Sequence, residues 1–433
     1  MTVNSKKNLT KKTLINYQEA LDIIKEISNK YQVKDIDNIP LVDTTHRLLA
    51  SDYLSPINVP PFNNSAMDGF AIQRKPANEL FNAQKPIKLQ VTGSIQAGDN
   101  AEIAAQVNTG NAWEIMTGAP VPAPFDAVIQ IENVEISENK NGKFITFNEE
   151  IKDNRNIRKL GTDYQLNQLV TNKHTQIQAQ HIMALATVGI ESIDVLAKIK
   201  VAILSTGNEL AKKSGHKLHS GKIHNSNQPF LKEYCKNLNC EPVFVGRCKD
   251  NIKDFNKLID QAIAQEVKII FSTGAVSMGK YDFIPQALIQ RGATIHFHKA
   301  KIRPGKPILF AELADGTLYF GLPGNPIAAA SGMRFFAAPF IRNMLGLNPE
   351  KPIKAKLLNN LDSKRGFRTF AKALASIDEH GQLCVDMLLD QGSYQSRSFA
   401  QSNCWLIIPE DRAAIHAGEL INIAPMTPNH MIF

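Results

Sequence analysis

The sequence predicts a multidomain α/β plus β protein with a central, doubly wound α/β domain at 199–346. The first observation is that apolar, strand-like runs such as 201–205 and 269–272 alternate with helical segments there, as in a parallel sheet with helices on both faces. The second is that 61–149 and 347–433 contain short β-like runs separated by Gly, Pro and Asn. The third is the length of 433 residues, which exceeds one core and indicates several compact units.

The N-terminal part is predicted to be an elongated, partly helical domain interrupted by a β domain. Residues 13–32 carry apolar side chains at three- and four-residue steps, and 175–197 return to helical spacing before a short strand. We therefore expect a discontinuous domain at 10–60 and 150–198, with an inserted β domain at 61–149.

The α/β domain and the C-terminal segment have separate patterns. We expect strands at 201–205, 242–246 and 269–272, a hairpin at 308–321 that turns at Asp315-Gly316, and a last helix from Pro326 to about 345. From 351 onward no helical period is evident, which predicts a small β-barrel or sandwich at 347–433.

Composition excludes several classes of protein. With 43% hydrophobic and 21% charged residues the chain is typical of a soluble globular protein, and its most apolar long window, 321–341, is interrupted by prolines and Arg334. The net charge of +8 is scattered, without the arginine-rich runs of nucleic-acid binders. Five cysteines without a C-x-x-C pair, and no secretory signal, indicate a reducing, cytoplasmic setting without membrane or nucleic-acid partners.

Three glycine-containing loops follow predicted strands of the α/β domain. They are 205–210, 272–279 and 321–326, and the carboxyl ends of parallel strands are where such sheets bind ligands. Asn325 can cap the last helix, whose free N–H groups favour an anion. The simpler alternative is that all three are tight turns, which is less probable for three loops at one edge than for one.

Basic residues are concentrated between Asp282 and Glu312, an interval without a carboxylate. They are Arg291, Lys299, Lys301, Arg303 and Lys306. The alternation over 298–303 resembles a strand that places Lys299, Lys301 and Arg303 on one face. This pattern fits either a solvated edge strand or a clamp for phosphate or another oxyanion.

Three carboxylates occur in the same loops: Glu209, Asp250 and Asp282. Singly, each is more often a cap or a solvated loop residue, and Asp250 is expected to cap the helix that follows it. Together, beside cations and phosphate-type loops, they suit a Mg²⁺ ion that bridges anionic groups.

These motifs together resemble the molybdopterin molybdenumtransferase family, which includes bacterial MoeA and the C-terminal domain of gephyrin. The resemblance extends from about residue 15 to the C-terminus. It rests on an ordered set of segments: 64–71 (NSAMDGFA), 115–122 (IMTGAPVP), 156–158 (NIR) with 161–163 (GTD), 205–210 (STGNEL), 276–279 (VSMG) with Asp282, 303–307 (RPGKP) and 322–326 (LPGNP).

The resemblance implies insertion of molybdate into adenylylated molybdopterin, with release of AMP and with Mg²⁺ as cofactor. It also implies a four-domain homodimer, with the central domain of the molybdopterin-binding type and an active site between that domain and the N-terminal β domain of the other subunit. A molybdopterin adenylyltransferase is a further expected partner.

The same resemblance implies a set of site residues. The expected catalytic residues are Asp68, Glu209, Asp282, Lys299 and Arg303, and the expected metal ligands are Glu209, Asp250 and Asp282. The expected substrate-binding residues are Thr117, Arg158, Asp163, Ser205, Gly207, Gly274, Ser277, Lys306, Pro323, Gly324, Asn325, Lys372 and Ser393.

The sequence departs from the family pattern at several positions. Asn208 and Asn225 stand where the family has acids, and Ala275 stands where it has glycine, which would cost about 1 kcal/mol if the backbone needs a positive φ. Arg303 stands where the family usually has lysine, and Lys372 stands where it usually has arginine. Residues 124–126 (PFD) replace the family's Gly-Ala-Asp. An alternative is therefore a catalytically impaired paralogue that binds or scaffolds molybdopterin or a partner. Adenylylation of molybdopterin is disfavoured, because it would leave the Asp68 and Thr117 motifs unused.

Overall fold

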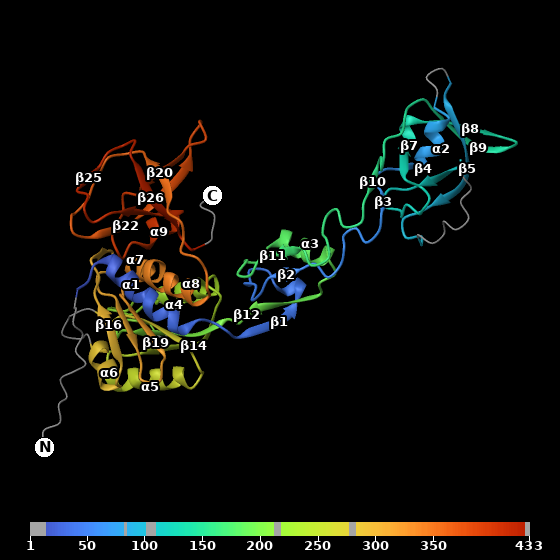
Figure 1. Cartoon of the computed structure of the whole chain (residues 1–433). Helices are drawn as coiled ribbons and strands as arrows, with labels where there is room; N and C mark the ends of the chain where they lie inside the picture. Colours follow the sequence, from blue (N-terminus) through green and yellow to red (C-terminus); the bar gives the residue numbers. More distant parts are fainter. Residues whose placement is uncertain (1–13, 82–84, 101–109, 212–217, 277–282, 429–433) are drawn as a thin grey trace. The chain divides into compact units, whose positions relative to one another are not determined.

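The computed structural model describes residues 14–81, 85–100, 110–211, 218–276 and 283–428, and its internal contacts divide the chain into two compact units (Figure 1). Unit 1 comprises Met1–Asp37 and Leu196–Phe433, and unit 2 comprises Asn38–Val195. The four-part division expected from the sequence remains a prediction. Among the described residues, no helix is long and apolar enough to cross a membrane.

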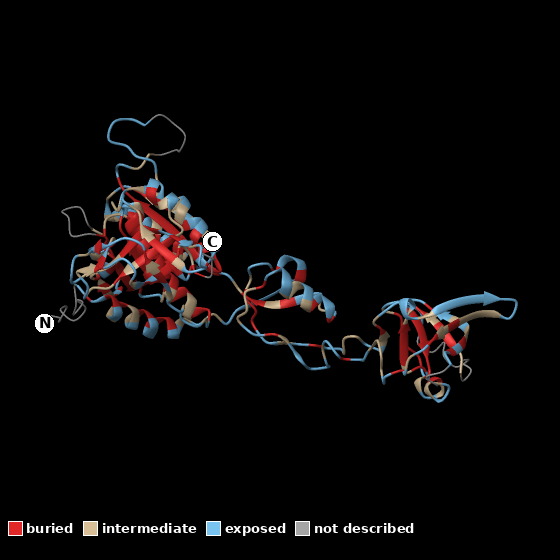
Figure 2. Ribbon diagram, turned by 90° about the horizontal axis from the view of Figure 1, so that it is seen from above, coloured by how far each residue is buried: buried red, intermediate tan, exposed pale blue. Residues whose placement is uncertain are grey.

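The centre of unit 1 is a six-stranded mixed sheet. Its strand order is β14 (Cys240–Cys248), β13 (Ile199–Thr206), β15 (Ile269–Thr273), β19 (Leu318–Leu322), β18 (Leu309–Glu312) and β16 (Thr294–His298). The first four strands run parallel, and β18 runs antiparallel to both β19 and β16. Strands β15 and β19 are buried along their whole length, as their continuous apolar runs predict, so the predicted α/β domain is confirmed (Figure 2).

Helices cover this sheet. They are α4 (Asn227–Lys236), α5 (Ile252–Ile263), α6 (Ile284–Gln290), α7 (Pro326–Gly332) and α8 (Ala338–Met344), the last two joined by a π-helical segment, Met333–Ala337. The predicted cap of α5 is wrong. Asn251, not Asp250, is the N-cap residue, and its side chain accepts a hydrogen bond from the backbone N–H of Asp254.

Helix α1 (Tyr17–Ser28) lies in unit 1, although the sequence analysis assigns it to the elongated N-terminal domain. Its apolar stripe packs on α8 and on the π-helical segment. The Tyr17 ring meets Phe336 and Phe370 edge-on, at centroid distances of 5.5 and 5.4 Å. The predicted amphipathic helix is present, and its buried face decides where it packs.

The C-terminal segment forms the predicted barrel. Five strands close on themselves: β22 (Arg368–Ile377), β23 (Leu383–Met387), β20 (Ile353–Leu357), β26 (Leu420–Pro425) and β24 (Cys404–Ile408), with β24 pairing back to β22. The pair β21 (Leu361–Asp362) and β25 (Ala414–Ile415) and the short helix α9 (Ser396–Gln401) complete it.

The strand predicted at 298–303 is not continuous. Lys299 has a φ of +95°, which ends β16 at His298, and the chain resumes as β17 (Ile302–Arg303), which pairs with β22 of the barrel. Burial still alternates, with Ala300 and Ile302 buried, but the residues no longer share one flat strand face.

The described part of unit 2 contains a six-stranded sheet, two-stranded ribbons and the α-helices α2 and α3. The sheet order is β7 (Ala127–Gln130), β4 (Gly69–Ile72), β6 (Ala112–Ile115), β5 (Ile87–Ile95), β9 (Gly142–Phe147) and β8 (Glu135–Asn139), with α2 (Arg74–Glu79) beside it. The ribbons are β2 (Tyr53–Leu54) with β11 (Leu169–Thr171) and β3 (Asn64–Ser65) with β10 (Ile157–Arg158). Helix α3 (Ala179–Thr187) is also in this unit, and the unit boundaries fall within the paired strands β1 (Ile36–Pro40) and β12 (Ser192–Leu196).

Candidate functional site

The three glycine loops of unit 1 meet at one edge of its sheet, because β13, β15 and β19 are adjacent parallel strands. The backbone N–H of Gly274 donates to the carbonyl of Leu322 at 3.2 Å. A Cβ on Gly274 would lie 2.5 Å from the carbonyl oxygen of Thr206, so only glycine permits this approach. Gly324 is also close to Gly274: a Cβ on Gly324 would lie 3.8 Å from the Cα of Gly274.

The loop after β13 folds Glu209 back over Gly207. A Cβ on Gly207 would lie 2.6 Å from the Glu209 carboxylate, so glycine is required for this arrangement too. Glu209 is exposed, and no described residue forms a hydrogen bond or ion pair with its carboxylate. Ser205, at the end of β13, is fully buried, and its hydroxyl has no hydrogen-bond partner among the described residues.

Asp250 fixes the same loop from the neighbouring strand end. Its carboxylate accepts a hydrogen bond from the backbone N–H of Asn208 at 3.1 Å. The carbonyl of Asn208 accepts from the Lys222 ammonium at 2.5 Å. The peptide of Asn208 is thus held on both sides, with a carboxylate to its N–H and a cation to its carbonyl.

The expected metal ligands are only partly described. Glu209 follows Asn208 in the chain, and the Asp250 carboxylate accepts the backbone N–H of Asn208. Asp282 and the expected substrate residue Ser277 lie outside the described residues. Among the described residues no group of three or more His, Cys, Asp or Glu side chains is placed to hold a metal ion. The predicted three-carboxylate site therefore remains a prediction.

The basic residues of 299–306 form a turn that rests on α7. A Cβ on Gly305 would lie 2.8 Å from the Ser331 hydroxyl, and that hydroxyl donates to the Pro304 carbonyl at 2.8 Å. Arg303 and Lys306 are exposed and lie over the ring of Phe367, at 4.7 and 5.8 Å from its centroid. The sequence analysis did not single out Phe367, because its contact with the 299–306 turn joins segments that are distant in sequence.

The start of α7 differs from the prediction. Asn325 is the N-cap residue, but its side chain makes no capping hydrogen bond; its amide instead donates to the Ser393 hydroxyl at 3.1 Å. The Ser393 carbonyl accepts from the N–H of Ile327 at 2.9 Å, so one free donor of the helix start is already used. Pro323 is buried, and the Gly324 carbonyl accepts from the Asn227 amide at 2.8 Å, a contact the sequence analysis missed.

Lys372 is not an accessible rim residue. It is only 1% exposed, and its ammonium donates to the Ser398 hydroxyl and to the carbonyls of Gly392 and Gln395. Burial lowers the pKa of this ammonium below its ordinary value, and Asp390 partly opposes the effect. Its contacts are those of a residue that orders the barrel loop beside Ser393.

The motif residues of unit 2 form a second cluster. The carboxylate of Asp68 accepts a hydrogen bond from the backbone N–H of Thr117 at 2.6 Å, and both residues are exposed. Arg158 pairs with Asn64 across β10 and β3, and Asp163 donates its backbone N–H to Val59 at 2.9 Å. The segments 64–71, 115–122 and 156–158 are therefore adjacent despite their separation in sequence.

The comparison with known families agrees with this architecture. Residues 15–189 match the MoeA N-terminal region (domain I and II), residues 202–343 match a probable molybdopterin binding domain, and residues 354–426 match the MoeA C-terminal region (domain IV). These three matches cover the chain from α1 to the last barrel strand.

Relatives of full length are also known. The chain is 33% identical over 415 residues to the molybdopterin molybdenumtransferase of Synechococcus elongatus, covering 95% of this chain and 99% of that protein. It is 34% identical over 395 residues to the Haemophilus influenzae protein of the same name, covering 90% and 94%. A crystal structure of a molybdopterin biosynthesis MoeA protein from Pyrococcus horikoshii superposes with a TM-score of 0.80 at 26% identity, covering 96% of this chain and all of that one.

Fold and matches together define a molybdenum cofactor biosynthesis protein with a central molybdopterin-binding-type domain. The chain belongs to the MoeA family of molybdopterin molybdenumtransferases.

Proposed function

We propose that this protein inserts molybdate into the dithiolene of adenylylated molybdopterin and releases AMP, with Mg²⁺ as the cofactor. The observation that carries the proposal is the convergence of the Gly207, Gly274 and Gly324 loops beside the Glu209 carboxylate, which has no partner among the described residues. Such an edge offers backbone donors to a pyrophosphate linkage, while the close packing of the glycines leaves no room for competing side chains.

The residues present fit a magnesium ion in their chemistry. Mg²⁺ prefers carboxylate oxygens and retains waters, and the Glu209 carboxylate is exposed without a partner among the described residues. Glu209, Asp250 and Asp282 would hold the ion, which would offset negative charge on the substrate's pyrophosphate. Arg303, Lys306 and Lys299 would attract the molybdate and phosphate anions.

We propose further that Gly207, Gly274, Ser205, Ser277, Pro323, Gly324, Asn325 and Ser393 line the substrate site. Asp68, Thr117, Arg158 and Asp163 would contribute from the second subunit of a homodimer. The ribbon of β2 and β11 supports a dimer, because Leu54 and Leu169 are register partners and are 49% and 43% exposed. A molybdopterin adenylyltransferase is the proposed donor of the substrate, in the cytoplasm.

The test is incubation of the full-length chain with adenylylated molybdopterin, molybdate and Mg²⁺ while AMP release is followed. Molybdate-dependent AMP release that stops on chelation of Mg²⁺ supports the proposal. Binding of the adenylylated substrate without AMP release would instead favour the catalytically impaired paralogue. The observations that favour this alternative are the amide at Asn208 and the strained backbone of Ala275 (φ +53°).

A further inference from the structure

A cavity of about 790 Å³ lies at the end of the central sheet of unit 1 that is opposite the glycine loops. Ile199, Lys268 and Thr317 line it where β13, β15 and β19 begin, whereas the glycine loops follow the last residues of these strands. The other walls are the chain after α1 and the ends of α5 and α8. All the lining residues are described, belong to unit 1 and are separate from the site above.

Backbone hydrogen bonds hold the walls of this cavity together. The N–H of Val33, in the chain after α1, donates to the carbonyl of Met344 at the end of α8, at 2.8 Å. The N–H of Ala197, just before β13, donates to the carbonyl of Asp35 at 2.9 Å. A ligand would therefore meet walls that are already in place, which lowers the entropy cost of binding.

The rim of the cavity is rich in lysine. The lining contains three carboxylates, those of Asp35, Glu266 and Asp315. Glu266 pairs with Lys200 at 3.2 Å, and the Asp315 carboxylate accepts the backbone N–H of Thr317 at 3.0 Å. Four further lysines are exposed and form no ion pair with any described residue: Lys30, Lys34, Lys198 and Lys268. The cavity therefore has a surplus of positive charge.

The floor of the cavity is apolar. Ile199, Val267 and Met344 line it and are buried, and Val33 and Ile263 beside them are half-buried. The cavity thus combines an apolar floor with a basic rim, and an inorganic anion alone would leave the floor unused.

The type of cation indicates which anion fits. The lining contains lysines but no arginine. Arginine is the side chain whose planar fork matches phosphate, whereas a lysine ammonium is a point charge on a flexible stem that can follow carboxylates in varied positions. A set of carboxylates around an apolar group therefore suits this cavity better than a phosphate does.

We propose that this cavity is a docking site for a partner protein, and that its occupant is an acidic peptide segment with apolar side chains between its carboxylates. The carboxylates would meet Lys30, Lys34, Lys198 and Lys268, and the apolar side chains would cover Ile199, Val267 and Met344. This inference does not depend on the proposed transferase function.

The experiment is a fluorescence anisotropy titration of the full-length chain, at low ionic strength, into a labelled peptide of sequence Glu-Asp-Leu-Leu-Asp-Glu. Lys34→Gln and Lys268→Gln should each weaken binding about three- to fivefold, as expected for one exposed ion pair. Lys232→Gln is the matched control, since Lys232 is exposed on α4 and does not line the cavity. A peptide with serine in place of both leucines should bind at least about tenfold more weakly.

Equal affinity in Lys34→Gln, Lys268→Gln and Lys232→Gln would overturn the proposal, as would equal binding of the serine peptide. Citrate or inorganic triphosphate that displaces the label as effectively as unlabelled peptide would also overturn it, because the cavity would then select charge alone. AMP release is measured separately. Its absence in the unaltered chain would remove the proposed transferase function and leave this inference to the peptide titrations.

Discussion

Thr117 donates two hydrogen bonds to the carboxylate of Asp68, one from its backbone N–H at 2.6 Å and one from its hydroxyl. These bonds lower the pKa of Asp68 below its ordinary value, the backbone bond more than the hydroxyl bond. Both residues are exposed, so the effect comes from hydrogen bonding and not from burial. The pair joins two motif loops of unit 2 that are 49 residues apart in sequence.

Thr117→Ala should raise the pKa of Asp68 toward, but not to, 3.8, because the backbone N–H donor remains. The measurement is an NMR titration of the Asp68 carboxyl carbon. Thr162→Ala is the control, since the Thr162 hydroxyl donates to the Lys159 carbonyl instead. An unchanged Asp68 pKa in Thr117→Ala would show that the hydroxyl contributes nothing.

The same pair gives a pH dependence of stability. Because the folded-state pKa of Asp68 lies below the unfolded value, its contribution is present above about pH 3.8 and is lost as the pH falls through the folded-state pKa. Asp68→Asn should lower the stability at pH 7, where the ionised carboxylate contributes, and should remove that part of the acid dependence, as followed by chemical denaturation between pH 2 and 7. Identical acid profiles of the two proteins would exclude the linkage.

Glu209→Gln should reduce molybdate-dependent AMP release by at least about 100-fold, because the amide removes a charged oxygen ligand of the proposed cation. The melting temperature should not change, since the carboxylate has no partner among the described residues. Glu241→Gln, an exposed acid on β14, is the control. Activity close to that of the unaltered protein would remove Glu209 from the mechanism.

The sequence predicted the parts of the fold that depend on local pattern. Continuous apolar runs predicted β13 and β15, and the 351–433 pattern predicted the barrel. The glycine loops were found because closely approaching backbones exclude a Cβ. What failed depended on tertiary contacts, such as the break at Lys299, where the chain crosses from the sheet to β22.

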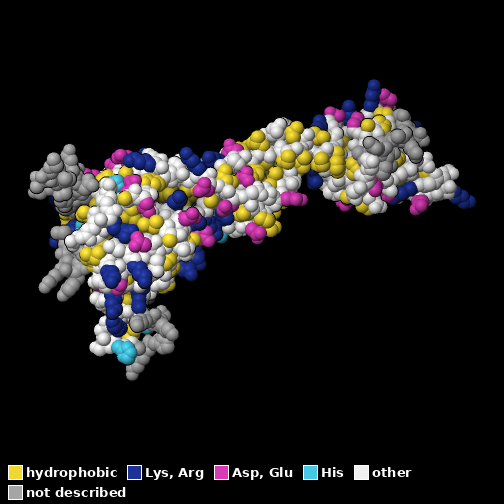
Figure 3. All heavy atoms as spheres, turned by 90° about the horizontal axis from the view of Figure 1, so that it is seen from below, with side chains coloured by type: hydrophobic (Ala, Val, Ile, Leu, Met, Phe, Trp, Pro, Cys, Tyr) yellow, Lys and Arg dark blue, Asp and Glu magenta, His cyan; other side chains and the backbone are white. Residues whose placement is uncertain are grey.

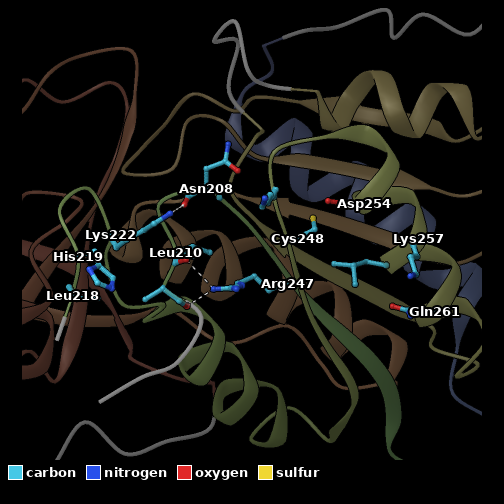
Figure 4. Close-up of a pocket in the computed structure, with 14 residues that line it drawn as sticks. Asn208, Leu210, Leu218, His219, Lys222, Arg247, Cys248, Asp254, Lys257 and Gln261 are labelled. Atoms are coloured by element: carbon cyan, nitrogen blue, oxygen red, sulfur yellow. Dashed lines mark hydrogen bonds between the residues drawn. The ribbon is translucent and has the colours of Figure 1, made fainter. Parts of the chain in front are cut away.

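Side-chain roles were harder to predict than positions. Asp250 and Asn251 are both favourable N-cap residues. The sequence does not show that the Asn251 side chain accepts the first N–H groups of α5 while the Asp250 carboxylate accepts the N–H of Asn208. Basic and acidic side chains are interspersed on the face shown in Figure 3, so charge alone does not mark a binding site there. The cavity beside β14 is lined by residues from the chain around Lys222, from β14 and from α5, which are distant in sequence (Figure 4).

Lys372→Ala should destabilise the fold by about 2–3 kcal/mol, because the buried Ser398 hydroxyl and the partly buried carbonyls of Gly392 and Gln395 lose their donor. Lys354→Ala, at an exposed position on β20, should have little effect. Since burial lowers the folded-state pKa of Lys372, the stability of the protein should increase with pH between that folded-state pKa and 10.5. This increase should be absent in Lys372→Ala. Urea denaturation between pH 7 and 10 tests both points, and equal stability of the two variants would contradict the buried network.

Ala275 has a φ of +53°, a conformation that costs a residue with a Cβ about 1 kcal/mol. Ala275→Gly should therefore stabilise the protein by up to about 1 kcal/mol, less the extra entropy of glycine in the unfolded chain. Ala264→Gly is the matched control: Ala264 is exposed at the end of α5 with a φ of −62°, so the same change there should destabilise by about 0.5–1 kcal/mol. Urea denaturation of both variants measures the difference in sign. If Ala275→Gly destabilises as much as Ala264→Gly, the loop after β15 does not hold residue 275 in the left-handed region, and the backbone approach of Gly274 to Thr206 would have to be relaxed in solution.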